Sequence, residues 1–193
     1  MTTYFGCYSV TDMNDYDTHP TKFHALLQEQ VHHEFTNSQQ YIAMAVYFDG
    51  ADLPQLAQHF YAQAVEERNH AMMLVQYLLD RDVRVDIPGI NGVRNSFDTP
   101  RDALALALDQ ERVVTEQVSR LTAVARDEAD YLGEQFMQWF LKEQVEEMSL
   151  MTSLVRVADR AGANLFDLEN FVAREIGTNH GSAEAPAAAG GRL

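Results

Sequence analysis

The stretch EERNH at residues 66–70 places Glu67 and His70 three positions apart. On a helix this spacing puts a carboxylate and an imidazole on one face, one turn apart, where both can bind one metal ion. Such a pair is a weak signal alone, because Glu and His meet at this spacing by chance in many sequences. Its value depends on whether other ligand-type residues recur at a matching distance.

The chain carries a partial repeat of this pattern. Glu34 lies 33 residues before Glu67, and the same step of 33 residues separates Glu111 from Gln144. Glu147 then follows Gln144 at the spacing of the first pair. Two half-repeats with polar ligands at one spacing predict a duplicated helical hairpin around a metal site.

Composition limits the classes of function. The 193 residues fit one domain, and 46% hydrophobic residues are enough for a sizeable core. A formal net charge of -15 argues against nucleic acid or an anionic membrane as partner and favours cations. The single cysteine, Cys7, cannot form an internal disulfide, and no apolar run reaches the ~20 residues that span a membrane. We therefore expect a cytoplasmic protein.

Apolar residues at helical spacing predict four long helices and a short fifth. The expected helices cover about 20–50, 54–80, 100–125, 131–161 and 165–176, with Asp52, Thr99 and Asn164 as N-caps of the second, third and fifth. Residues 81–98 are rich in Pro, Gly and Asn and form a long crossover. One long crossover among short connections predicts an all-α, ferritin-like four-helix bundle, with the short fifth helix added.

Three segments follow from this pattern. Residues 1–19 lack periodicity and are expected to form a flexible N-terminal arm. Residues 20–176 form the ferritin-like domain with its metal pair. Residues 177–193 are rich in Ala and Gly, which bury little surface, so we expect a flexible C-terminal tail.

Polar residues interrupt the apolar stripes at the middle of all four long helices. The interrupting positions are Glu34, Glu67, Glu111 and Gln144. One Glu on an apolar stripe is more often an edge residue than a ligand, but four at one level of an antiparallel bundle favour a site. Buried carboxylates need neutralisation, and two divalent ions balance the charge of Glu34, Glu67, Glu111 and Glu147. A single imidazole among oxygen ligands favours iron or manganese.

At this point the sequence resembles a known family. Tyr41 lies seven residues after Glu34, and Trp139 lies five before Gln144. Together with the stretches 60–70 and 133–147, these residues resemble bacterial non-haem ferritins, most of all the mycobacterial and related actinobacterial iron-storage type. The resemblance covers most of residues 20–176.

The resemblance implies a role for each polar side chain of the bundle centre. The first iron would bind Glu34, Glu67 and His70, with Glu67 bridging to a second iron held by Glu111 and Glu147. Gln144 would be a hydrogen-bonding neighbour, and Tyr41 would hydrogen-bond near the pair and donate an electron. A third iron position would use Glu66, Glu143, Glu146 and Glu147.

The resemblance also implies that no haem is bound. Haem-binding bacterioferritins repeat E-x-x-H in the fourth helix, whereas residues 144–147 here read Gln, Val, Glu and Glu. They also place the haem-ligating Met directly after the bridging Glu, where this chain has Arg68.

The implied activity is oxidation of Fe(II) by dioxygen or peroxide, followed by storage as hydrated ferric oxide. The family assembles as a 24-subunit hollow homo-oligomer, with the fifth helix near its fourfold axes. The acidic cluster Asp127, Glu128, Asp130 and Glu134 is a candidate lining for the path of iron into the shell, and an ordinary solvated loop is an equal alternative.

Two other functions stay open at this level. A ferritin-like protein that consumes peroxide without retaining a mineral would share the same site residues. A metal-free structural bundle would bury them without binding Fe(II). A DNA-protecting mini-ferritin is disfavoured, because the sequence has no basic arm to contact phosphate.

Overall fold

The computed structural model describes residues 21–176 and 185–193. Within these residues the chain forms helices and no strand. The helices are α1 (Lys22–Gly50), α2 (Pro54–Asp80), α3 (Pro100–Asp127), α4 (Tyr131–Ala161) and α5 (Leu165–Glu175). None of these helices is long and apolar enough to cross a membrane. The predicted arm, residues 1–19, and residues 177–184 of the predicted tail lie outside the described residues.

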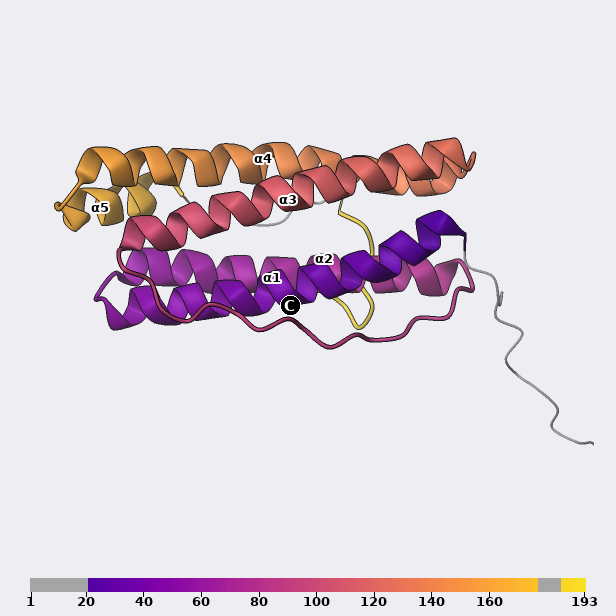
Figure 1. The fold of residues 1–193 in the computed structure, drawn as a ribbon, viewed down its shortest axis with the longest axis horizontal. Coiled ribbons are helices and arrows are strands. Elements are labelled where there is room, and N and C mark those ends of the chain that lie inside the picture. Colours follow the sequence, from indigo (N-terminus) through magenta and orange to yellow (C-terminus); the bar gives the residue numbers. More distant parts are fainter. Residues whose placement is uncertain (1–20, 177–184) are drawn as a thin grey trace, which may run out of the picture.

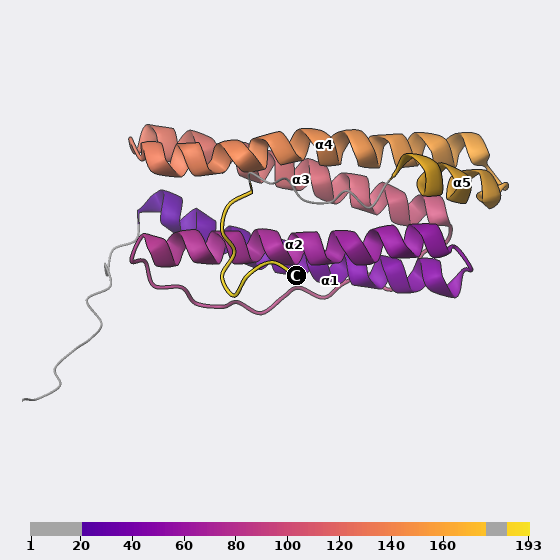
Figure 2. The ribbon, with the colours of Figure 1, turned by 180° about the vertical axis from the view of Figure 1, so that it is seen from behind.

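The bundle consists of two antiparallel helix pairs, α1 with α2 and α3 with α4 (Figures 1 and 2). Residues 81–99 join the pairs and run along the length of α1 (Figure 1). Gln40 of α1 holds this crossover, since its amide donates to the Arg94 carbonyl and accepts from the Arg94 N–H, both at 2.8 Å. α5 turns back at one end and contacts α4 and α2. The predicted ferritin-like topology is confirmed.

Local sequence explains most helix starts. Thr99 caps α3 by accepting a hydrogen bond from the Asp102 N–H at 3.1 Å, and Pro100 follows in the first turn. The predicted N-cap at Asp52 is wrong. Asp52 has a φ of 58°, and Leu53 is the N-cap residue, without a side-chain bond.

Distant carboxylates cap the two helices that lack an acidic first turn. Glu169 of α5 accepts from the N–H groups of Gln55 and Leu56 at the start of α2, at 2.8 and 3.0 Å. Glu128, between α3 and α4, accepts from Lys22 and Phe23 at the start of α1, both at 3.0 Å. Each carboxylate meets the positive end of a helix and ties two elements together.

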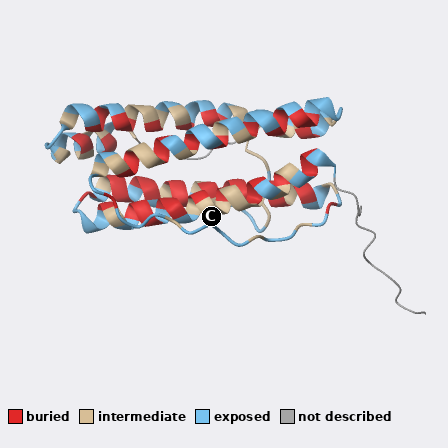
Figure 3. Ribbon diagram, viewed as in Figure 1, coloured by how far each residue is buried: buried red, intermediate tan, exposed pale blue. Residues whose placement is uncertain are grey.

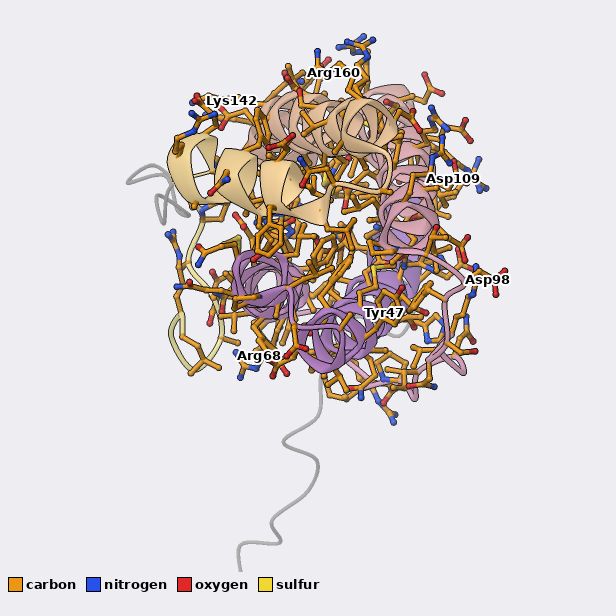
Figure 4. The ribbon with its side chains drawn as sticks, turned by 90° about the vertical axis from the view of Figure 1, so that its left-hand side faces the viewer. Tyr47, Arg68, Asp98, Asp109, Lys142 and Arg160 are labelled. Carbon is orange, nitrogen blue, oxygen red and sulfur yellow. The ribbon has the colours of Figure 1, made fainter. Side chains whose placement is uncertain are left out.

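The core falls into two apolar clusters on either side of a polar layer. One cluster is centred on Phe48, Leu56, Phe60, Leu104 and Leu154, and the other on Leu27, Leu74, Leu78, Leu121 and Met137. Buried residues line the inward faces of all four long helices (Figure 3). Charged residues such as Asp109, Lys142 and Arg160 lie outside (Figure 4). The polar layer between the clusters holds the mid-helix residues predicted from the sequence.

The last described residues return to α2. The Ala189 N–H donates to the Met72 carbonyl at 3.0 Å, and the Leu193 N–H donates to the Asn69 side chain at 3.3 Å. Ala185 and Ala189 pack against the second apolar cluster. This contact was not foreseen from the Ala and Gly content of residues 177–193.

At Gly133, the backbone of α4 packs closely against Phe23 of α1. A Cβ at this position would lie 2.4 Å from a ring carbon of Phe23 and 3.0 Å from a carboxylate oxygen of Asp130. We therefore expect Gly133→Ala to lower the free energy of unfolding by about 1–3 kcal/mol through overpacking. Gly50→Ala is the matched control, because a Cβ at Gly50 meets no atom within 4 Å. Calorimetric melting of both variants tests the expectation, and equal melting temperatures would contradict it.

Candidate metal centre

Three predicted ligands converge at the middle of the first helix pair. Glu34 of α1 and Glu67 and His70 of α2 each offer one ligand atom, and these atoms lie within 4.8 Å of one another. The three residues are only 1%, 2% and 3% exposed. The His70 ring packs edge-on against Trp139 and Phe140, with centroids 5.6 and 5.7 Å apart. These ring contacts restrict the orientation of the imidazole.

Several buried ligand atoms lack a hydrogen-bond partner among the described residues. They are Oε2 of Glu34, Oε2 of Glu67, Nε2 of His70 and Oε2 of Glu147. Buried polar atoms are nearly always paired, because an unpaired one loses its hydration without compensation. Three carboxylate oxygens and one imidazole nitrogen can all be satisfied by divalent cations. A donor set of carboxylates with one imidazole fits iron or manganese.

Glu111 faces this group from the second helix pair and is fully buried. Its Oε1 accepts from the Tyr41 hydroxyl of α1, and its Oε2 accepts from Nε2 of Gln144 at 3.4 Å. The Thr115 hydroxyl lies 2.8 Å from Oε1 of Gln144. The structure therefore places Tyr41 and Gln144 beside the Glu111 carboxylate.

Gln63 connects the centre with the acidic residues predicted for a third iron. This buried amide donates to Glu66 at 2.8 Å and to Glu147 at 3.4 Å. Glu143 of the predicted third position is buried, whereas Glu146 is exposed. The third group is thus more open to solvent than the mid-bundle group.

Burial raises the pKa of three central carboxyl groups, those of Glu67, Glu111 and Glu147. The pKa of Glu67 lies well above its usual value because of burial and the nearby charges of Glu34 and Glu111. Burial also raises the pKa of Glu147, with Glu111 adding to the effect. For Glu111 burial raises the pKa to about 7, although the hydrogen bond from Tyr41 opposes it. Without a cation, this layer favours protonated carboxyl groups.

Three neighbouring side chains were missed in the sequence. Gln30 donates to Glu34 at 2.7 Å, Gln63 donates to Glu147, and Thr115 contacts Gln144. Each lies four residues from a ligand-type residue of its own helix: Gln30 from Glu34, Gln63 from Glu67 and Thr115 from Glu111. This spacing places both side chains on one helix face, so a search one turn from each carboxylate would have found them.

The acidic cluster near the α3–α4 corner is largely engaged within the chain. Glu128 caps α1, Asp130 caps α4 by accepting from the Gly133 N–H at 3.0 Å, and Glu134 accepts from Arg126. These contacts explain three of the four carboxylates as parts of helix junctions. A role for the cluster in the path of iron stays a prediction.

Comparisons with known proteins point to one family. The ferritin-like domain family matches residues 24–161. Ferritin BfrB of Mycobacterium tuberculosis is 74% identical over 181 residues, which cover 94% of this chain and 100% of that protein. Ferritin BfrB of Mycolicibacterium smegmatis is 75% identical over 173 residues, covering 90% and 96%. A crystal structure of an open pore ferritin from the archaeon Archaeoglobus fulgidus has a TM-score of 0.77 at 26% identity, covering 80% of this chain and 96% of that one.

The raised pKa of Glu111 predicts how the metal-free fold responds to pH. Between its usual value of 4.5 and about 7, the folded state holds a proton that the unfolded state releases. The free energy of unfolding should therefore fall as the pH rises through this window. We expect the metal-free protein to melt at a lower temperature at pH 8 than at pH 5, and saturating divalent metal to reduce this difference.

The variant Glu111→Gln tests the cause. It keeps the side-chain volume and removes the charge, so it should raise the melting temperature of the metal-free protein at pH 8 by at least about 2 °C. Glu116→Gln on the exposed face of the same helix is the control and should have no effect. A pH dependence unchanged by Glu111→Gln would assign the effect to other groups.

Proposed function

Because this chain belongs to the ferritin family, we propose that its buried polar layer is the centre at which it oxidises iron. As a ferritin it stores iron and acts as a ferroxidase. The proposed iron ligands are Glu34, Glu67, His70, Glu111 and Glu147. The observation that carries this assignment is the set of buried ligand atoms of Glu34, Glu67, His70 and Glu147 that have no hydrogen-bond partner among the described residues.

Each ligand has a proposed part in the reaction. Glu34 and His70 hold one Fe(II), Glu111 and Glu147 hold the second, and Glu67 lies between them. Two Fe(II) ions together supply the two electrons that reduce dioxygen to peroxide, or peroxide to water. Carboxylates suit this reaction because they stabilise the higher charge of Fe(III). Tyr41, whose hydroxyl is hydrogen-bonded to Glu111, would donate a further electron.

The finer assignments extend this proposal. A third iron would be held by Glu66, Glu143, Glu146 and Glu147. The hydrogen bonds that Gln63 donates to Glu66 and to Glu147 support a link between this third position and the two-iron centre. Arg68 occupies the position where a haem-ligating Met would be needed, so we infer a haem-free protein. We also infer a hollow homo-oligomer of 24 chains in the cytoplasm.

The ligand assignment predicts the behaviour of two variants. Glu67→Ala and His70→Ala should each slow the rapid phase of Fe(II) oxidation by at least about 100-fold, because each removes an iron ligand. Stopped-flow absorbance after aerobic Fe(II) addition measures this phase. Light scattering checks that the oligomer is intact, and the mass of the loaded particle measures retained iron.

His33→Ala is the matched control, since this histidine lies on α1 outside the centre and should leave the rate unchanged. Oxidation at the wild-type rate in both ligand variants would move the centre elsewhere. Rapid peroxide consumption by the wild type without retained iron would favour a detoxifying function.

The third position predicts a separate effect. Glu143→Gln should remove the third metal ion bound per chain in an anaerobic titration, because it deletes one of four carboxylates. Oxidation of the first two Fe(II) ions should stay within about twofold of the wild-type rate. The exposed Glu29→Gln serves as control. Unchanged stoichiometry in Glu143→Gln would refute this third site.

A further inference from the structure

Thr115 lies one helical turn beyond Glu111 on α3 and is half-buried. Its hydroxyl oxygen is 2.8 Å from Oε1 of Gln144 and 2.8 Å from the backbone carbonyl of Glu111. Among the described residues, this hydroxyl makes no hydrogen bond to the side chain of a predicted iron ligand or to Tyr41. Its polar contact toward the centre is therefore the carboxamide of Gln144.

The hydroxyl has one proton to give and two acceptors within reach. Inside a helix, the Glu111 carbonyl already accepts the N–H of the residue four positions later, which is Thr115 itself. Oε1 of Gln144 has no such helical donor. We therefore expect the Thr115 hydroxyl to donate its proton to Oε1 of Gln144.

The orientation of the Gln144 carboxamide follows from this contact. With Oε1 directed to Thr115, the NH₂ group faces Oε2 of Glu111 at 3.4 Å. When Glu111 is ionised, the reverse orientation would place two acceptors, the amide oxygen and the carboxylate oxygen of Glu111, against each other. Hydrogen-bond networks are the basis on which the two ends of an amide are distinguished.

We propose that Thr115 is a positioning residue that turns Gln144 so that it donates to Glu111 and does not offer its oxygen to iron. The proposal rests on the proposed two-iron function. The proposed orientation of Gln144 affects the coordination of the second iron. The second iron is bound by carboxylates, and the coordination position that an amide oxygen would fill stays open to the oxidant.

The sequence offers a close set of variants for a test. Thr115→Val keeps the shape and removes the hydroxyl, and Thr115→Ser restores the hydroxyl. Thr122→Val is the matched control, because Thr122 lies two turns along α3, is buried, and donates to the Val118 carbonyl at 2.9 Å. Thr122→Val therefore loses the same type of hydrogen bond, from a threonine hydroxyl to a carbonyl of its own helix, at a position that does not contact Gln144.

Neutron diffraction of the metal-free, deuterated wild type at pH 8, above the pKa of Glu111, shows the orientation of the Gln144 amide directly. The proposal expects the deuterons of Gln144 to face Glu111. Deuterons that face Thr115 would overturn it, whether or not the protein oxidises iron. If the Gln144 amide has the expected orientation but the protein does not oxidise Fe(II) rapidly, the proposed function is contradicted and the orientation is not.

Metal binding gives the second readout, with Co(II) as the probe. In Thr115→Val the amide is free to turn, so its oxygen should bind Co(II) in the second position and change the visible absorption spectrum. Rapid Fe(II) oxidation should slow by about tenfold, the effect of one lost hydrogen bond. Thr115→Ser and Thr122→Val should match the wild type in both measurements. Equal changes in Thr115→Val and Thr122→Val, or no change in either, would overturn the proposal.

Discussion

A layer of buried carboxylates at mid-bundle is the constraint on which the rest of the structure depends. Glu34, Glu67 and Glu111 are at most 2% exposed and lie between two apolar clusters. Mutual repulsion and lost hydration make this arrangement unfavourable without protons or cations. The apolar clusters on either side stabilise the helices that hold the layer. The metal-free fold therefore keeps a strong affinity for positive charge at its centre.

The two halves of this layer differ in how their charges are satisfied. On the α1–α2 side, Glu34, Glu67 and His70 each keep a ligand atom with no partner among the described residues. On the α3–α4 side, both oxygens of Glu111 accept hydrogen bonds, from Tyr41 and Gln144, and of the proposed ligands there only Glu147 keeps an oxygen without a partner among the described residues. The sequence already contains this asymmetry, because His70 and Glu147 occupy matching places in the two half-repeats. The two half-repeats therefore share their spacing and differ in their side chains.

Sequence reasoning succeeded where one helix determines the outcome. The ligand spacing of Glu67 and His70 follows from helical geometry, and the Thr99 cap follows from local hydrogen bonding. It failed where a distant element decides. The α2 start depends on Glu169, more than 110 residues away, and so could not be assigned from Asp52 nearby. The return of residues 185–193 to α2 likewise depends on a tertiary surface that composition does not describe.

The acidic residues behind the net charge of -15 have different roles, which depend on the surroundings of each carboxylate. Glu128 and Glu169 each meet the positive end of a helix, so their charge contributes to the junctions of the bundle. Glu134 pairs with Arg126 at the surface, where screening makes such a pair weak. The mid-bundle carboxylates have neither a helix end nor an arginine among the described residues, and they share one small volume. Residue type alone therefore does not separate structural from chemical carboxylates. Burial without a counter-charge does, and three of the four positions that the 33-residue spacing selects, Glu34, Glu67 and Glu111, are buried in this way.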